Sequence, residues 1–315
     1  MDIAKVIAQE LGIRAGQVEA TVKLIDEGCT IPFIARYRKE VTGSLNDEVL
    51  RDLYERLNYL RNLEERKETV IASIEEQGKL TDALKKQILD AMTLVAVEDL
   101  YRPYKQKRRT RATIAKEKGL EGLANIIYLQ MADHPIETDA QEYISEEKGV
   151  ASVDEAITGA LDIIAENISD EAEYRTYIRD ITVKEGKLVT AAKDAEAKSV
   201  YEMYYDFEEP IAKAAGYRIL AINRGEKEKV LSVKVMAPEE RILRYLEKKI
   251  IVRDNPYTTP LLQQAVEDSY KRLISGAIER EIRSDLTEQA EDGAIAVFGK
   301  NLKQLLMQPP IKGQV

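Results

Sequence analysis

A short basic segment holds the residues of this sequence whose types and spacing could do chemistry. Residues 101–118 read YRPYKQKRRTRATIAKEK and contain eight Lys or Arg side chains and one acid, Glu117. These counts give the segment a charge of +7 and leave −16 for the rest of a chain whose net charge is −9. Closely spaced cations suit phosphate binding, because each neutralised phosphate releases condensed counterions. The candidate nucleic-acid-binding residues here are Arg102, Lys105, Lys107, Arg108, Arg109 and Arg111.

The same charge pattern has a second interpretation. The cations can form a solvated face that pairs with the acidic remainder of the chain or with another domain. Charge alone leaves both interpretations open. Tyr101 and Tyr104 likewise either stack on bases or pack as core aromatics. A weaker second basic patch is expected on one helix, where residues 36 and 39 share a face and residue 38 points elsewhere. Its members are Arg36, Arg38 and Lys39.

The sequence offers few groups for catalysis or metal binding. His134 is the only histidine and Cys29 the only cysteine, which removes intrachain disulfides and metal sites built from several such residues. No glycine-rich phosphate loop is present. Asp206, Glu208 and Glu209 are either metal-binding carboxylates or partners of the N-terminal dipole of a following helix. We expect no catalytic residues, no metal and no cofactor, and so no enzyme.

Composition is typical of a folded protein of the cytoplasm. The chain of 315 residues is 44% hydrophobic and 33% charged, which fits a soluble, folded protein with a heavily charged surface. No apolar run approaches the roughly 20 residues needed to cross a bilayer. The first residues, MDIAKVIAQELG, contain acids and no cleavage site, and a single cysteine suits a reducing compartment. We expect a cytoplasmic monomer without a membrane partner.

Apolar residues recur about every 3.6 positions, which predicts a mainly α-helical fold. Gly-containing turns separate three short helices that resemble a helix-turn-helix in outline, although most such units only pack. The expected short helices span residues 3–11, 15–27 and 31–43, the last capped by Thr30. A long helix follows, from a cap at Asn46 or Ser44 to Gly78. We assign residues 1–80 to this helix-turn-helix-like unit and its long bridging helix.

The second expected domain spans residues 81–308 and is also helical. Its first helix runs to about Leu94, and another begins at Thr113 after the basic segment. Short extended segments are expected near residues 181–190 and 230–235. Further helices are expected over residues 120–131, 138–148 and 153–167, the last with a capping box formed by Ser152 and Glu155.
They resume near residue 239, break near residue 293 and end at Met307. Residues 309–315 are predicted to be a truncated linker.

Three stretches also resemble a known family. They are TIPFIARYRKEVTGSLNDEVLRDL, LYRPYKQKRRTRATIAKEKGLEGLA and YYDFEEPIAKAAGYRILAINRGEKEKVL. Together they resemble the N-terminal half of bacterial Tex transcription accessory proteins. The resemblance implies that a ribonuclease-H-like domain, a helix-hairpin-helix segment and an S1-type domain follow, and that the ribonuclease-H-like domain is missing after residue 315. It implies RNA or DNA as a partner of the full-length protein, and transcription machinery as another. It supplies no catalytic residues.

Two functions follow as alternatives. In the first, the chain is the N-terminal helical part of a Tex-like protein that supports nucleic-acid binding and transcription regulation. In the second, it is a protein-interaction scaffold that docks RNA polymerase or the protein's own C-terminal domains, without direct nucleic-acid contact. The two differ in whether the basic segment stays open to solvent or is neutralised within the fold.

Overall fold

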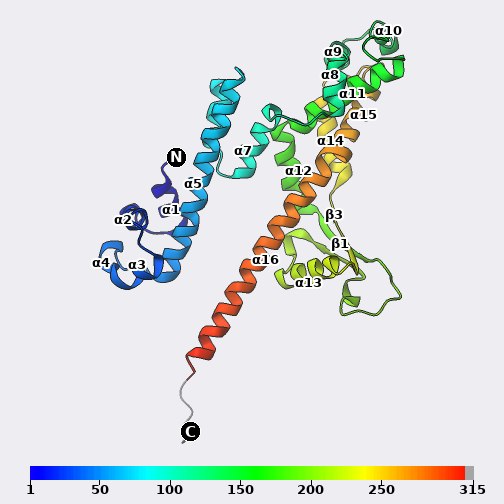
Figure 1. Cartoon of the computed structure of the whole chain (residues 1–315). Helices are drawn as coiled ribbons and strands as arrows, with labels where there is room; N and C mark the ends of the chain where they lie inside the picture. Colours follow the sequence, from blue (N-terminus) through cyan, green and yellow to red (C-terminus); the bar gives the residue numbers. More distant parts are fainter. Residues whose placement is uncertain (309–315) are drawn as a thin grey trace, which may run out of the picture. The chain divides into compact units, whose positions relative to one another are not determined.

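The computed structural model describes residues 1–308, which fall into two compact units (Figure 1). The first is Met1–Gln106, and the second begins at Lys107. Each unit has its own buried apolar core. Helices account for most of the described chain and one small sheet lies in the second unit, so the predicted mainly α fold is confirmed.

The first unit is entirely helical. Its elements are α1 (Ile3–Leu11), α2 (Ala15–Asp26), α3 (Ile31–Tyr37), α4 (Lys39–Thr42), α5 (Asp47–Glu76), α6 (Asp82–Asp90), α7 (Leu94–Tyr101) and the 3-10 turn η1 (Arg102–Tyr104). The predicted bounds of the first helix are confirmed, and Gly12 ends it in a left-handed conformation that glycine adopts without strain.

Helix α5 is the central element of this unit. The Asn46 side chain caps it by accepting a hydrogen bond from the Val49 N–H, as predicted. Leucines spaced three and four residues apart point into the core and are buried. Helices α1, α3, α6 and α7 pack against α5, with Ile88 and Val97 in the same core. The compact unit therefore continues past residue 80, where the sequence placed the first boundary.

Two predicted helices are each divided in the structure. The helix expected over residues 31–43 is interrupted at Arg38, whose φ of −130° is not helical. The side chain of Gln17 in α2 donates to the carbonyl oxygens of Thr42 and Gly43, which holds α4 against α2. Thr30 precedes α3 but makes no side-chain cap. The helix expected after Thr81 similarly ends at Asp90, before α7 begins.

The second unit combines helices with a small sheet. Its elements are α8 (Arg111–Glu117), α9 (Glu121–Leu129), α10 (Ile136–Gln141), α11 (Val153–Asp170), α12 (Ala172–Glu185), β1 (Lys187–Ala192), η2 (Glu202–Tyr204), β2 (Asp206–Pro210), η3 (Ile211–Lys213), α13 (Gly216–Lys227), β3 (Leu231–Met236), α14 (Glu239–Ile250), α15 (Thr259–Asp268), the π-helical turn η4 (Ser269–Ile274) and α16 (Ser275–Leu306).

Helix α11 organises the larger core of this unit. The Ser152 hydroxyl accepts from the Glu155 N–H, which confirms the predicted N-cap. Its apolar face includes Ala160 and Ile164, which are buried where α8, α9 and α15 pack against the helix. Since α8 carries part of the basic segment, this packing positions the candidate cations on the second unit.

The sheet is antiparallel, with strand order β2-β1-β3. The predicted start of the extended segment at Ile181 is wrong, because α12 continues to Glu185 and β1 begins only at Lys187. Helix α12 packs one face against α16. Strand β2 was not expected. Its residues Asp206, Glu208 and Glu209 pair along β1, and the short 3-10 helix η3 follows directly after Pro210.

Helix α16 is the longest element of the second unit (Figure 1). It packs against α12, α13 and β3. The break predicted near Gly293 is wrong, because α16 continues through this residue to Leu306. The helix contains no proline, the residue that most often causes a kink. The predicted linker over residues 309–315 lies outside the described residues. Within residues 1–308, no helix combines the length and apolar character that a bilayer crossing requires.

Candidate nucleic-acid interface

The start of the basic segment belongs to the first unit and is held against α5. The hydroxyls of Tyr101 and Ser73 lie 3.0 Å apart, and the Arg66 guanidinium lies over the Tyr101 ring. The side chain of Gln77 donates to the Tyr104 carbonyl oxygen at 2.9 Å. Both tyrosines are half-buried against the core, so they pack as core aromatics and are not open base-stacking platforms.

Two predicted cations lie in this first part. Arg102 is half-buried and has an interaction partner of its own. Lys105 is exposed, and its ammonium lies 3.8 Å from the Glu98 carboxylate. Exposed pairs at this separation contribute little stability and are screened by salt. Lys105 therefore remains able to exchange Glu98 for a phosphate, whereas Arg102 is a poor candidate.

Lys107 opens the second unit and is neutralised within it. Its ammonium donates to the Asp170 carboxylate and lies 3.6 Å from the Glu166 carboxylate, both on α11. The Lys107 side chain is only 26% exposed, and both acids are more buried than that. Lys107 therefore pairs with the chain's own acids, which is the second interpretation of the basic segment. It is not a candidate for phosphate binding.

The helix after the basic segment begins earlier than expected. Its cap is Thr110, whose hydroxyl accepts from the Thr113 N–H at 3.0 Å, so the prediction of Thr113 as the cap is wrong. The Thr110 and Thr113 hydroxyls also lie 2.8 Å apart, which makes Thr113 part of the first turn. Arg111 consequently occupies the first helical position, and the loop that presents Arg108 and Arg109 is short.

Three arginines of the second unit remain at the surface. Arg109 pairs with Glu117 at 2.9 Å, but these side chains are 69% and 53% exposed, so salt and competing anions can replace the contact. Arg108 and Arg111 are exposed, and their side chains form no ion pair or hydrogen bond with any residue that the structure describes. Burial raises the pKa of Asp162, while Arg272 and then Arg111 oppose that rise through their charges.

The second basic patch lies in the first unit, around the junction of α3 and α4. Arg36, Arg38 and Lys39 are exposed, and none of them forms an ion pair within residues 1–308. The prediction that residues 36 and 39 share one helix face is wrong, because α3 ends at Tyr37. The patch is nevertheless less neutralised than the main basic segment.

Sequence reasoning missed two aromatic side chains in this patch. Phe33 and Tyr37 are 38% and 55% exposed, and their ring centroids lie 5.3 Å apart. The Arg38 guanidinium lies 5.3 Å from the Phe33 centroid, and the Arg36 guanidinium 5.8 Å from the Tyr37 centroid. The signal was the four-residue spacing of the rings within FIARYRK, which places them together on a helix surface.

The groups considered for catalysis have structural partners. His134 lies 2.6 Å from Asp133 and 3.1 Å from Asp139, and hydrogen bonds to these carboxylates, Asp133 first, raise the pKa of its imidazole. Buried Glu209 forms an ion pair with Arg218. Among the described residues, no three His, Cys, Asp or Glu side chains gather as a metal site would require.

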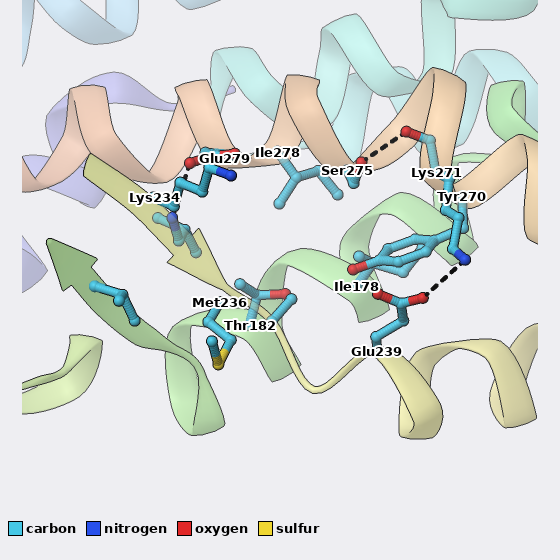
Figure 2. Close-up of a pocket in the computed structure, with 13 residues that line it drawn as sticks. Ile178, Thr182, Lys234, Met236, Glu239, Tyr270, Lys271, Ser275, Ile278 and Glu279 are labelled. Carbon is cyan, nitrogen blue, oxygen red and sulfur yellow. Dashed lines mark hydrogen bonds and ion pairs between the residues drawn. The ribbon is translucent and has the colours of Figure 1, made fainter. Parts of the chain in front are cut away.

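A separate cavity of about 490 Å³ lies between α12, β3, η4 and α16 (Figure 2). Burial raises the pKa of Tyr270 to about 12. Lys271 pairs with Glu267 at 2.6 Å and faces Glu239 at 3.4 Å. Glu279 accepts from the Val235 N–H at 2.8 Å. The charged groups Lys271, Glu239 and Glu279 at this cavity therefore all have ion-pair or hydrogen-bond partners.

The fold and its surface define a mainly helical protein with exposed, uncompensated arginines on both units. Residues 1–75 match the Tex-like protein N-terminal domain, and residues 132–298 match the Tex central region. The chain belongs to the Tex family.

Curated relatives agree with this assignment. The chain is 52% identical over 311 residues to the Bacillus subtilis protein YdcI, matching 98% of this chain and 43% of the relative. It is 40% identical to the transcriptional accessory protein Tex of Neisseria gonorrhoeae, over 98% and 42% of the two chains. It is 30% identical to human S1 RNA-binding domain-containing protein 1, over 99% and 33%. The chain therefore spans less than half the length of each of these relatives.

Proposed function

We propose that this chain is the N-terminal helical part of a Tex-type transcription accessory protein and that it contacts RNA or DNA through Arg108, Arg109 and Arg111. The observation that carries the proposal is the absence of an ion pair or hydrogen bond, within the described chain, at Arg108 and Arg111. An exposed cation without a carboxylate partner gives up no existing contact when it binds a phosphate. The names of two relatives, a transcriptional accessory protein and an S1 RNA-binding domain protein, support a nucleic-acid role.

The contact we propose is with the backbone and not with base edges. Arg108 and Arg109 precede α8 in a short loop, and Arg111 is the first residue of that helix. Phosphate contacts of this kind add affinity and orientation but carry no sequence information. The chain would act by binding, without catalysis, as a monomer in the cytoplasm that adds a basic surface to a longer transcription protein.

The test is a salt titration of RNA and DNA binding by fluorescence anisotropy. The double variant Arg108→Gln/Arg111→Gln removes two phosphate contacts, so the slope of log affinity against log salt should become shallower by about 1.5. A matched control is Arg244→Gln/Arg280→Gln, because these arginines are also exposed without ion pairs in the described second unit. An unchanged affinity and slope in the first variant would rule out this contact.

A protein-interaction role is a second candidate, favoured by the far end of α16. Its exposed apolar side chains recur at alternating three- and four-residue spacing, the pattern of a helix that packs against another helix. They are Ile295, Phe298, Leu302 and Leu305. The double variant Phe298→Ser/Leu302→Ser should then weaken capture of purified RNA polymerase, or of the C-terminal domains of the longer protein, without changing anisotropy with RNA. If the variant captured these partners as well as the wild-type chain does, the protein-interaction role would be wrong.

A further inference from the structure

The junction of α3 and α4 presents an aromatic and basic surface that the proposed function does not use. Phe33 and Tyr37 lie one helical turn apart, with their rings tilted by 47° at a centroid distance of 5.3 Å. We call this surface, with Arg36, Arg38 and Lys39, the FRYRK patch. Every cation of the patch lies within two residues of Tyr37 along the chain.

The core of the first unit does not require the two rings. Helix α3 is anchored by Ile34, which is fully buried, with Ile31 and Ala35 packed beside it. Phe33 and Tyr37 are absent from this packed cluster and remain 38% and 55% exposed. Their mutual contact gives a short helix only a few tenths of a kcal/mol, which a leucine pair would supply as well. Folding therefore does not account for two exposed aromatic rings.

The charge of the patch is also uncompensated. Arg36, Arg38 and Lys39 form no ion pair within residues 1–308, and the acid within residues 31–43 is Glu40. This stretch therefore has a net charge of +2 in a chain of net charge −9. Among the described residues, the Arg38 guanidinium donates only to the Tyr37 carbonyl oxygen, at 3.3 Å, and it lies over the Phe33 ring. A polyanion is the ligand that complements this charge.

We propose that the FRYRK patch binds single-stranded RNA or DNA, with bases stacked on Tyr37 and Phe33 and phosphates on the three cations. An aromatic ring binds a base through its face, and base faces are accessible only where the strand is not paired in a duplex. Each guanidinium that now covers a ring can move to a phosphate while the base takes its place. Arg36 and Arg38 thus hold the rings ready in the unbound protein.

This inference shares with the proposed function the premise that the chain binds nucleic acid, but it uses different residues. The test compares a 15-nucleotide oligothymidine containing one 2-aminopurine, its uridine counterpart, and the same DNA strand in a duplex. Binding is followed by anisotropy, and stacking by 2-aminopurine fluorescence, with the 315-residue chain. We expect the wild-type protein to bind either single strand more tightly than the duplex and to change the 2-aminopurine signal.

Two variants separate stacking from charge. Phe33→Leu/Tyr37→Leu should weaken single-strand binding by at least about fivefold for each ring, abolish the 2-aminopurine change and leave the salt slope unaltered. Arg36→Gln/Arg38→Gln/Lys39→Gln should make the salt slope shallower by about 2. Tyr54→Leu is the matched control, because Tyr54 is an exposed tyrosine of the same unit without a neighbouring ring in the described chain.

The outcomes distinguish this inference from the proposed function. If Phe33→Leu/Tyr37→Leu binds single strands like the wild type, or loses duplex and single-strand affinity equally, stacking on the FRYRK patch is wrong. That result leaves the Arg108→Gln/Arg111→Gln experiment unaffected. Conversely, normal binding by the Arg108→Gln/Arg111→Gln variant with a loss in the ring variant would refute the main contact and support the FRYRK patch. A circular dichroism spectrum confirms that each variant is folded.

Discussion

The ammonium of Lys107 is paired with the carboxylate of Asp170 at the end of α11, while the guanidinium of the next residue has no such partner. Glu166, one turn earlier on α11, lies 3.6 Å from the same ammonium. Because both acids are largely buried, Lys107 compensates charge that would otherwise be poorly solvated. Arg108 faces solvent without an ion pair in the described chain. Neighbours in a basic run thus have separate roles.

This relationship predicts opposite effects of neighbouring substitutions. Lys107→Gln should lower the free energy of unfolding of the second unit by about 1–3 kcal/mol, because it removes a cation that interacts with two largely buried carboxylates. Arg108→Gln should change it by less than about 0.5 kcal/mol, as an exposed site does. Urea unfolding followed by circular dichroism measures both. Equal stability of the two variants would show that the pair with Asp170 does not stabilise the unit.

The basic segment shows how far its sequence could predict its role. Clustering of the cations was evident, and so was the choice between phosphate binding and internal pairing. The choice itself depends on acids such as Asp170, which is remote in sequence and approaches only when α8 packs on α11. Local patterns contain no information about that approach, so Lys107 and Arg108 were indistinguishable. The tyrosines were undecidable for the same reason, since α5 covers them.

A partly buried ion-pair cluster between α12 and α16 gives the second prediction. Arg175 of α12 is fully buried and donates to Glu281 at 3.1 Å, and Arg179 donates to the other carboxylate oxygen at 2.8 Å. Glu281→Gln removes the charge that both guanidiniums share, which should lower the free energy of unfolding by about 2–4 kcal/mol. Thermal and urea unfolding measure the change.

Glu288→Gln is the control for that measurement. Glu288 lies on the same helix, is exposed and forms no ion pair among residues 1–308, so its substitution should change stability by less than about 0.5 kcal/mol. A loss of stability at Glu288 equal to that at Glu281 would mean that the net charge of α16, and not the buried pair, governs stability.

The errors in the predicted elements have a common physical origin. Capping and periodicity correctly located α1, α5 and the start of α11, because these signals are local. Strand β2 was missed because its residues, DFEEP, alternate little in hydrophobicity and are extended by pairing with β1. The break expected at Gly293 did not occur, because glycine costs a helix only about 1 kcal/mol when neighbouring turns continue.

Alanine substitutions at two helical glycines should therefore change the stability of the second unit in opposite directions. A Cβ added at Gly225 in α13 would lie 3.0 Å from Leu231 Cγ and 3.2 Å from Tyr201 Cδ1, so Gly225→Ala should destabilise the unit by about 1–3 kcal/mol. At Gly293 in α16 an added Cβ meets no atom within 4 Å, so Gly293→Ala should stabilise by about 0.5–1 kcal/mol. Melting temperatures compare the variants directly. A stabilising alanine at Gly225 would contradict the packing of α13 on the sheet.

The single imidazole of the chain gives the last prediction, a dependence of stability on pH. Hydrogen bonds from His134 to Asp133 and then Asp139 raise the pKa of this imidazole above its usual 6.5. The charged form is therefore favoured in the folded protein. Its stabilising contribution is complete below the unfolded pKa and is lost as the pH rises through the higher folded pKa. His134→Gln should remove this pH-dependent part of the unfolding free energy, as measured by urea unfolding at a series of pH values.

Nuclear magnetic resonance can measure the cause directly, since one histidine gives one set of imidazole signals. The titration midpoint in the folded protein should exceed 6.5 and fall toward it in 1 M salt, because the site is exposed to screening ions. Asp139→Asn should lower the midpoint, while Asp154→Asn, at another exposed acid of the same unit, should leave it unchanged. A wild-type midpoint at or below 6.5 would show that the two carboxylates do not hold His134 in its charged form.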